Sequence, residues 1–119
     1  MLFRSSRLAD CVTATQRDIL DSRLVAPIVG HVGDGNFHVG LLVDDTDAEE
    51  MTRVRAFMER LVHRAIDMEG TCTGEHGVGQ GKAKYLAKEY PPASLDVMRT
   101  LKRALDPDNI MNPGKILPV

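Results

Sequence analysis

Apolar residues recur every three or four positions in three stretches of the chain, the spacing of one face of an α-helix. The first stretch runs from Ser6 to about Leu20, the second from Ala48 to Gly70, and the third follows Pro91 and Pro92. A short helix is also predicted from Ala83 to Glu89. The predicted inward-facing positions are Leu8, Val12, Thr15 and Ile19 in the first helix, Met51, Val54, Met58, Leu61, Ala65 and Met68 in the second, and Leu95, Met98, Leu101 and Leu105 in the third.

The second stretch, AEEMTRVRAFMERLVHRAIDMEG, has the clearest helical pattern. Acidic residues crowd its first turn, where the helix dipole favours them, and Asp44 to Asp47 supply candidates for its N-cap. Gly70 suits the left-handed position just past the end of the helix. His63 falls among the polar positions and is expected on the surface. The face predicted to meet water carries Glu50, Arg53, Arg60, Arg64 and Asp67.

Two apolar runs, Val25–Val32 and Asn36–Val43, flank the dipeptide Asp34-Gly35. Asp-Gly between such runs is the strongest short-range signal for a hairpin with a two-residue loop. The hairpin lies between predicted helices, in the order helix, strand, strand, helix, loop, helix, helix. This order predicts an α+β fold, an antiparallel sheet with helices packed on one face. The core face of the sheet would carry Ile28, Val32, Phe37, Val39, Leu41 and Val43.

A two-residue loop at Asp34-Gly35 would place His31 directly opposite His38, with Cβ atoms ~5 Å apart on one face of the sheet. Two imidazoles at that separation can bind one ion through metal–nitrogen bonds of ~2.1 Å. A three-residue loop, which would shift the pairing, and a purely structural histidine pair beside a turn are the alternatives. Small residues beside the histidines leave room for a ligand: Gly33, Asn36 and Gly40.

A second loop, TGEHGVGQGK (73–82), offers Glu75 and His76 between glycines. Adjacent residues of an extended loop point in opposite directions, so Glu75 can complete a two-histidine, one-carboxylate set while His76 faces a substrate. Such a set leaves coordination positions open, which suits a catalytic ion. Cys72 is an alternative ligand that would favour a closed zinc site. The glycines match neither phosphate-binding pattern, because GxxxxGK[ST] needs Gly at position 76 and Ser or Thr at position 83, and GxGxxG does not fit their alternation.

The composition is that of one ordinary globular domain over residues 1–119, with 43% hydrophobic and 27% charged residues. A net charge of −2 with interspersed signs argues against nucleic acid as a partner. No apolar run approaches the ~18 residues of a membrane span. The start lacks the apolar segment of a signal peptide, so a cytoplasmic location is expected. Cys11 and Cys72 form no CxxC pair and are expected to be reduced and buried.

Three motifs, HVGDGNFH (31–38), GEHGVGQGK (74–82) and DPDNIMNPGKILP (106–118), resemble the C-terminal part of the FAD-linked oxidases. This group includes cytochrome-type D-lactate dehydrogenases, glycolate oxidase flavin subunits and D-2-hydroxyglutarate dehydrogenases. The resemblance extends from about Ser6 to the end of the chain. It implies the ferredoxin-like half of an α+β cap domain that carries a divalent-metal site and packs on a separate FAD-binding domain.

The resemblance also implies roles for individual residues. His31, His38 and Glu75 match the metal ligands, His76 matches the active-site base, and Asn112 lies in the tail segment that approaches the flavin. Nitrogen and oxygen ligands of this kind accept zinc, manganese or iron. In the implied reaction the ion polarises the hydroxyl of a small 2-hydroxy acid, His76 takes the hydroxyl proton, and C2 gives hydride to FAD.

Two departures from the family shape the functional hypothesis. The 2-hydroxyglutarate relatives have a substrate-binding Asn two positions after the second ligand histidine, and Gly40 stands there in this chain, which favours D-lactate or glycolate. The FAD-binding domain lies outside these residues, so we expect a fragment or one part of a split enzyme. Such a part would be inactive alone and would need a flavin-binding domain or partner chain. The full-length enzyme could lie at the periphery of the inner membrane.

The alternative hypothesis is a non-catalytic α+β module left from a truncated gene. An apolar face without its flavin domain would favour self-association, for example as a homodimer.

Overall fold

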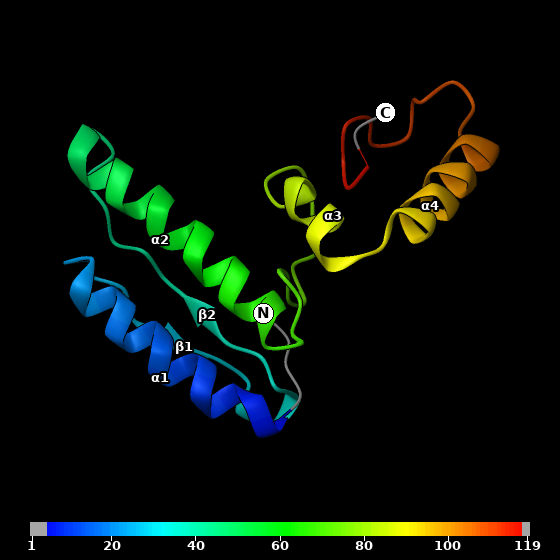
Figure 1. Cartoon of the computed structure of the whole chain (residues 1–119). Coiled ribbons are helices and arrows are strands. Elements are labelled where there is room, and N and C mark those ends of the chain that lie inside the picture. The colour runs from blue at the N-terminus through cyan, green and yellow to red at the C-terminus, as the bar shows by residue number, and fades with distance from the viewer. Residues whose placement is uncertain (1–4, 118–119) are drawn as a thin grey trace. The chain divides into compact units, whose positions relative to one another are not determined.

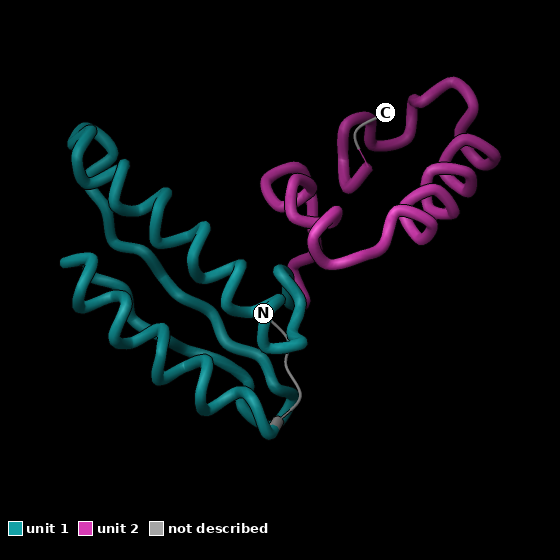
Figure 2. The backbone as a smooth tube through the Cα atoms, viewed as in Figure 1, with its two compact units in different colours: residues 1–74 teal, residues 75–119 magenta. Residues whose placement is uncertain are grey.

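The computed structural model describes residues 5–117, and the chain divides into two compact units, residues 1–74 and 75–119 (Figure 2). The first unit contains α1 (Ser5–Asp21), β1 (Ile28–Val29), β2 (His38–Val39) and α2 (Ala48–Asp67) (Figure 1). The second unit contains α3 (Leu86–Glu89) and α4 (Pro92–Leu105). Single 3₁₀ turns lie at Val32–Asp34 and Ala83–Tyr85. Helices combined with one antiparallel two-stranded sheet confirm the α+β fold, whereas a single domain over residues 1–119 stays a prediction.

The core of the first unit lies where α1 and α2 contact each other. The inward positions predicted for α1 are confirmed, with Val12 half-buried and the others buried. On α2 the prediction that Met58 faces inward is wrong, because its side chain is 45% exposed while Phe57 is fully buried. Burying Phe57 turns the apolar stripe of the helix away from Met58. The buried residues of the two helices are Leu8, Cys11, Thr15, Asp18, Ile19, Val54, Phe57, Leu61, Val62 and Ala65.

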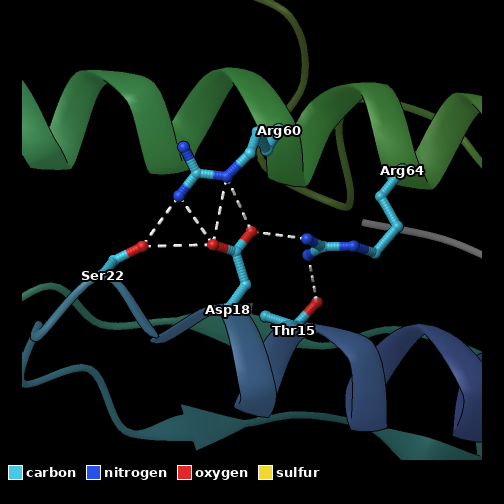
Figure 3. A network of polar contacts seen from close by, with 5 residues as sticks. All are labelled: Thr15, Asp18, Ser22, Arg60 and Arg64. Carbon is cyan, nitrogen blue, oxygen red and sulfur yellow. Dashed lines mark hydrogen bonds and ion pairs between the residues drawn. The ribbon is translucent and has the colours of Figure 1, made fainter. Parts of the chain in front are cut away.

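A charged network joins α1 to α2 within this unit (Figure 3). The carboxylate of Asp18 accepts hydrogen bonds from Arg60 Nη2 at 2.6 Å and from Arg64 Nη2 at 2.5 Å. Ser22 Oγ donates to the same carboxylate at 3.1 Å, and Arg64 Nη1 donates to Thr15 Oγ1 at 3.1 Å. The predicted wet face is confirmed for Arg60, which is exposed, whereas Arg64 is half-buried. Both arginines also reach from α2 to a buried carboxylate of α1 that the hydrophobic pattern does not reveal (Figure 3).

Burial by itself would raise the pKa of Asp18. The hydrogen bonds from Arg60, Arg64 and Ser22 outweigh this effect and lower the pKa below its ordinary value of 3.8. The side chain of Asp18 is only 10% exposed, so its charge depends on these donors. The network thus stabilises the contact between α1 and α2 as long as Asp18 is ionised.

Cys11 and Cys72 form no disulfide and are both fully buried, which confirms their prediction as inward-facing thiols. Burial raises the pKa of the Cys11 thiol above 9.0, against the opposing hydrogen bond to Thr15 and the charge of Arg64. A thiol in this state is a poor nucleophile. Cys11 is therefore part of the core packing.

The two ends of α2 show how local sequence fixes its boundaries. The side chain of Asp47 accepts hydrogen bonds from the backbone N–H groups of Glu49 at 2.8 Å and Glu50 at 3.0 Å, the arrangement of an N-cap. At the other end Glu69, with φ 61°, takes the left-handed position that was predicted for Gly70. The N–H of Gly70 reaches back to the carbonyl of Ala65 at 2.8 Å, so Gly70 is one residue later in the same motif.

The antiparallel hairpin differs from its prediction in register. Val29 pairs with His38 and Ile28 with Val39, while an isolated bridge joins Val25 to Leu42. The prediction of a two-residue loop at Asp34-Gly35 is therefore wrong, and residues 30–37 connect the two strands. The physical reason is a 3₁₀ turn in which the carbonyl of His31 accepts from the N–H groups of Asp34 (2.9 Å) and Asn36 (3.2 Å).

This connection also changes the predicted core face. Phe37 is 3% exposed and lies in the core, whereas Val32 is 70% exposed and Val43 is 40% exposed. Val32 is part of the 3₁₀ turn and not of a strand, so the alternation of strand faces does not apply to it. The core face of the hairpin is confirmed for Phe37 and, as half-buried residues, for Ile28, Val39 and Leu41.

In the second unit, α4 begins at the predicted proline pair, with Pro92 in its first turn. Leu95 is buried and Met98 half-buried, as its apolar stripe predicts. Leu101 and Leu105 are 57% and 78% exposed, so their predicted burial is wrong for this chain. No helix among residues 5–117 is both long enough and apolar enough to cross a membrane.

Candidate functional site

His31 and His38 lie near each other across the hairpin, although they are not directly opposite. Their ring centroids are 6.4 Å apart and the rings are nearly perpendicular, at 89°. The observed partner of His38 is Val29, two residues before His31. His31 lies in the connection and not in a strand, so the alternation of strand faces does not apply to it. The short distance between the rings nevertheless brings the two histidines together despite the wrong register.

The surroundings of the pair are partly open and partly packed. A Cβ added to Gly33 would meet no atom within 4 Å, so there is space beside the turn. Asn36 is 1% exposed, and its amide nitrogen lies 3.4 Å from His38 Nε2. Asn36 is therefore a buried neighbour that can fix the orientation of the His38 ring. His38 itself is half-buried and His31 is exposed.

Gly30 is a constraint at this site that the hydrophobic pattern did not reveal. A Cβ at this position would lie 2.3 Å from the carbonyl oxygen of Asn36 and 2.6 Å from the Cα of Phe37. The two arms of the connection therefore approach too closely for any other residue. The sequence signal was a glycine directly before His31, inside a predicted strand, where glycine often marks a close backbone approach.

The histidine pair is compatible with one metal ion as regards donor chemistry and reach. A histidine nitrogen binds a metal at ~2.1 Å, so two rings on opposite sides of one ion have centroids at most about 6.5 Å apart. The observed 6.4 Å lies at this upper limit. Imidazole nitrogen suits zinc, manganese and iron.

Glu75 and His76 lie together in the second unit. Their side chains are exposed, and His76 Nε2 is 3.6 Å from Glu75 Oε1. The expectation that they point in opposite directions is wrong, because these residues form a turn and not an extended segment. Gly77 follows with φ 76°, a left-handed conformation that favours glycine. In this turn the carboxylate is close enough to orient the imidazole.

Asn112 lies in the tail after α4, where its φ of 48° places it in the left-handed region. It is exposed and lines an open pocket of the second unit. The tail is organised by Asp106, which ion-pairs with Lys102 and accepts the backbone N–H groups of Ile110 at 3.0 Å and Met111 at 2.9 Å. The Lys102 ion pair and these N–H groups lower the pKa of Asp106 below 3.8, against the effect of burial.

The structure thus forms two pairs from the five predicted site residues, one in each unit, and places Asn112 in the second unit. His63, predicted to be a surface histidine, is exposed on α2 and lies 3.7 Å from Glu59. That prediction is confirmed. His63 also provides an internal reference for a histidine outside the candidate site.

Comparison with known proteins identifies the domain family of the chain. The chain belongs to the family described as "FAD linked oxidases, C-terminal domain", whose model matches residues 3–116. The resemblance noted from the three motifs is therefore confirmed.

The curated relatives named here cover 73% to 95% of the chain. It is 50% identical over 112 residues to "Probable D-lactate dehydrogenase, mitochondrial" of Danio rerio, with 94% of this chain and 22% of the relative covered. It is 42% identical over 113 residues to "D-lactate dehydrogenase [cytochrome], mitochondrial" of Arabidopsis thaliana, with 95% and 20% covered. It is 46% identical over 87 residues to "Glycolate oxidase subunit GlcD" of Bacillus subtilis, with 73% and 18% covered. The chain therefore spans about a fifth of the length of these relatives.

Proposed function

We propose that this chain supplies the metal- and substrate-binding part of an FAD-dependent 2-hydroxy-acid dehydrogenase. The match to the C-terminal domain of FAD-linked oxidases carries the proposal, and the proximity of His31 and His38 supports it. His31, His38 and Glu75 are the proposed ligands of a divalent ion, and Asn112 is the proposed contact to the flavin. Most of the FAD contacts would come from a flavin-binding domain or partner chain.

The substrate is proposed to be D-lactate or glycolate. The relatives' names support this class, since they include D-lactate dehydrogenases and a glycolate oxidase subunit. Gly40, in place of a substrate-binding asparagine, supports a small substrate without a second carboxylate. The relatives named as mitochondrial make that compartment an alternative to the cytoplasmic location expected from the sequence.

The side chains of this part would position the substrate and move one proton. When bound, the ion supplies Lewis acidity toward the substrate hydroxyl, and FAD supplies the acceptor for the C2 hydride. His76 is the proposed base that takes the hydroxyl proton on its imidazole. Glu75 Oε1, 3.6 Å from His76 Nε2, would orient the imidazole for this transfer.

Metal titration tests the ligand assignment. We expect the chain to bind about one Zn²⁺ or Mn²⁺ ion in a calorimetric titration, and His31→Ala or Glu75→Ala to abolish that binding. His63→Ala is the matched control, because it removes an exposed histidine from α2 and should leave the affinity unchanged. Circular dichroism would check that each variant is folded. Binding by both site variants at the parent's affinity would show that the ligand set is wrong.

A second candidate is the non-catalytic, self-associating module, which the exposed apolar residues of α4 favour. Val97, Leu101 and Leu105 lie four positions apart along one side of the helix and are 60%, 57% and 78% exposed. This candidate requires no bound ion, so the same titration separates the two. Restored 2-hydroxy-acid oxidation after mixing with a flavin-bearing chain would also argue against it.

A further inference from the structure

The loop that carries Glu75 and His76 lacks side-chain packing at its glycines. A Cβ added at Gly77, Gly79 or Gly81 would meet no atom within 4 Å. Gly77 and Gly79 also have positive φ values of 76° and 55°. A loop with so many unpacked, permissive positions has many accessible conformations, and ordering it costs entropy. Backbone hydrogen bonds therefore help to hold its conformation.

One of these hydrogen bonds comes from the tail of the chain. The N–H of Ile116 donates to the carbonyl oxygen of Gly79 at 2.7 Å, across 37 positions of sequence. Beside this bond, a Cβ at Gly114 would lie 3.6 Å from the amide nitrogen of Gln80. We call residues 106–117 the strap, because they run from the end of α4 back to this loop. Asp106 anchors the strap at its beginning and Ile116 ties it to the loop near its end.

The strap is held in a strained conformation at the point of contact. Ile116 has φ 61°, and a β-branched residue in the left-handed region is a genuine outlier. Such strain persists only where the surrounding structure imposes it. Asn109 and Asn112 also have positive φ, but asparagine tolerates that region. The backbone strain is therefore concentrated at Ile116, the residue whose N–H donates to the loop.

We propose that the strap positions the Glu75–His76 turn through the Ile116–Gly79 hydrogen bond. Ile116 is then a positioning residue that acts on the site through backbone contacts and touches neither substrate nor cofactor. The bond lies three residues after His76, so it fixes the loop immediately beside the proposed base and ligand. The role of the turn rests on the proposed function, but the ordering of the loop by the strap does not.

Hydrogen exchange of the full chain tests the ordering directly. Ile116→Pro removes the donor, while Ile116→Gly keeps the N–H and relieves the strain. We expect Ile116→Pro to increase exchange at the amides of Lys82 and Ala83, which donate to Val78 and Gln80 within the loop. In Ile116→Gly these amides should keep at least the parent's protection. Unchanged exchange in Ile116→Pro, with α4 still folded, would overturn the proposal.

Metal affinity then tests the consequence for the site. We expect Ile116→Pro to weaken Zn²⁺ or Mn²⁺ binding about tenfold, in the range found when the support of a metal ligand is removed. Ile116→Gly should bind as tightly as the parent or more tightly. If the parent chain binds no ion, the proposed function is wrong. The hydrogen-exchange data would still show whether the strap orders the loop. If Ile116→Pro loosens the loop but keeps full affinity, the loop is ordered by the strap without positioning the ligand, and the proposal is overturned.

Discussion

Asp18 is the central acceptor of the polar contact between α1 and α2. It is 9% exposed and accepts hydrogen bonds from two arginines of α2 and from Ser22. Hydrogen bonds to a charged group are worth about 1.5–3 kcal/mol each when a partner is removed. Arg60 is half-exposed and can return to water, so its share is smaller than that of Arg64, whose side chain is 17% exposed.

Replacing the Asp18 carboxylate should therefore weaken the first unit. We expect Asp18→Asn to lower the free energy of unfolding by about 2 kcal/mol, because the variant loses the charge but keeps the shape. Asp10→Asn, at an exposed position of the same helix, should change it by less than about 0.5 kcal/mol. Urea unfolding followed by circular dichroism measures both. If Asp18→Asn lowers the free energy of unfolding no more than Asp10→Asn does, the network contributes no measurable stability.

The same carboxylate predicts a dependence of stability on pH. The pKa of Asp18 is lowered in the folded chain, so the unfolded state binds more protons between that value and 3.8. Lowering the pH below about 4 therefore favours unfolding, and the stabilisation by Asp18 is present above 3.8 and lost as the pH falls through the folded pKa. Asp18→Asn should lose less stability than the parent over this acidic range.

At the scale of elements, the helices could be predicted from sequence because each has a strong local signal. The period of apolar residues gives α1 and α2, the N-cap gives the start at Asp47, and the proline pair gives the start of α4. The hairpin could be predicted only in part. Asp34-Gly35 is a turn signal, but the 3₁₀ turn that begins after His31 competes with it and is held by the burial of Phe37 and by Gly30.

Both helices of the first unit end with a charged residue in the left-handed conformation. In α1 this residue is Arg23, with φ 53°, and the N–H of Leu24 donates to the carbonyl of Ile19 at 3.1 Å. In α2 it is Glu69. Glycine is the residue that usually occupies this position, and other residues pay about 1 kcal/mol for it. In α2 the sequence pattern therefore predicted the left-handed position at Gly70, one residue after Glu69, which actually occupies it.

This strain gives a prediction for the end of α1. We expect Arg23→Gly to raise the free energy of unfolding by about 0.5–1 kcal/mol, because glycine adopts positive φ without a steric cost. Arg17→Gly is the matched control, since it makes the same substitution inside α1 and should lower stability by about 1 kcal/mol. Urea denaturation measures both. Destabilisation by Arg23→Gly would mean that the arginine side chain contributes more than the strain costs.

At the scale of the whole molecule, the chain consists of two units with cores of unequal size. Among the described residues, the buried hydrophobic side chains of the second unit are Tyr85, Leu86 and Leu95, while the rest of the core belongs to the first unit. This inequality could not be read from the sequence. The stripe of α4 is as regular as that of α2, and a pattern indicates which face is apolar but not whether anything covers it.

The unequal cores predict unequal stability along the chain. A unit as small as residues 75–119, with so few buried side chains, gains little from hydrophobic burial. We therefore expect the amides of α4 to be roughly tenfold or more less protected from hydrogen exchange than those of α2. A divalent ion that binds the folded second unit should raise the protection of its amides in proportion to ligand saturation. Equal protection of α4 and α2 without metal would instead mean that the chain unfolds as one cooperative unit, in which the small core of residues 75–119 shares the stability of residues 1–74.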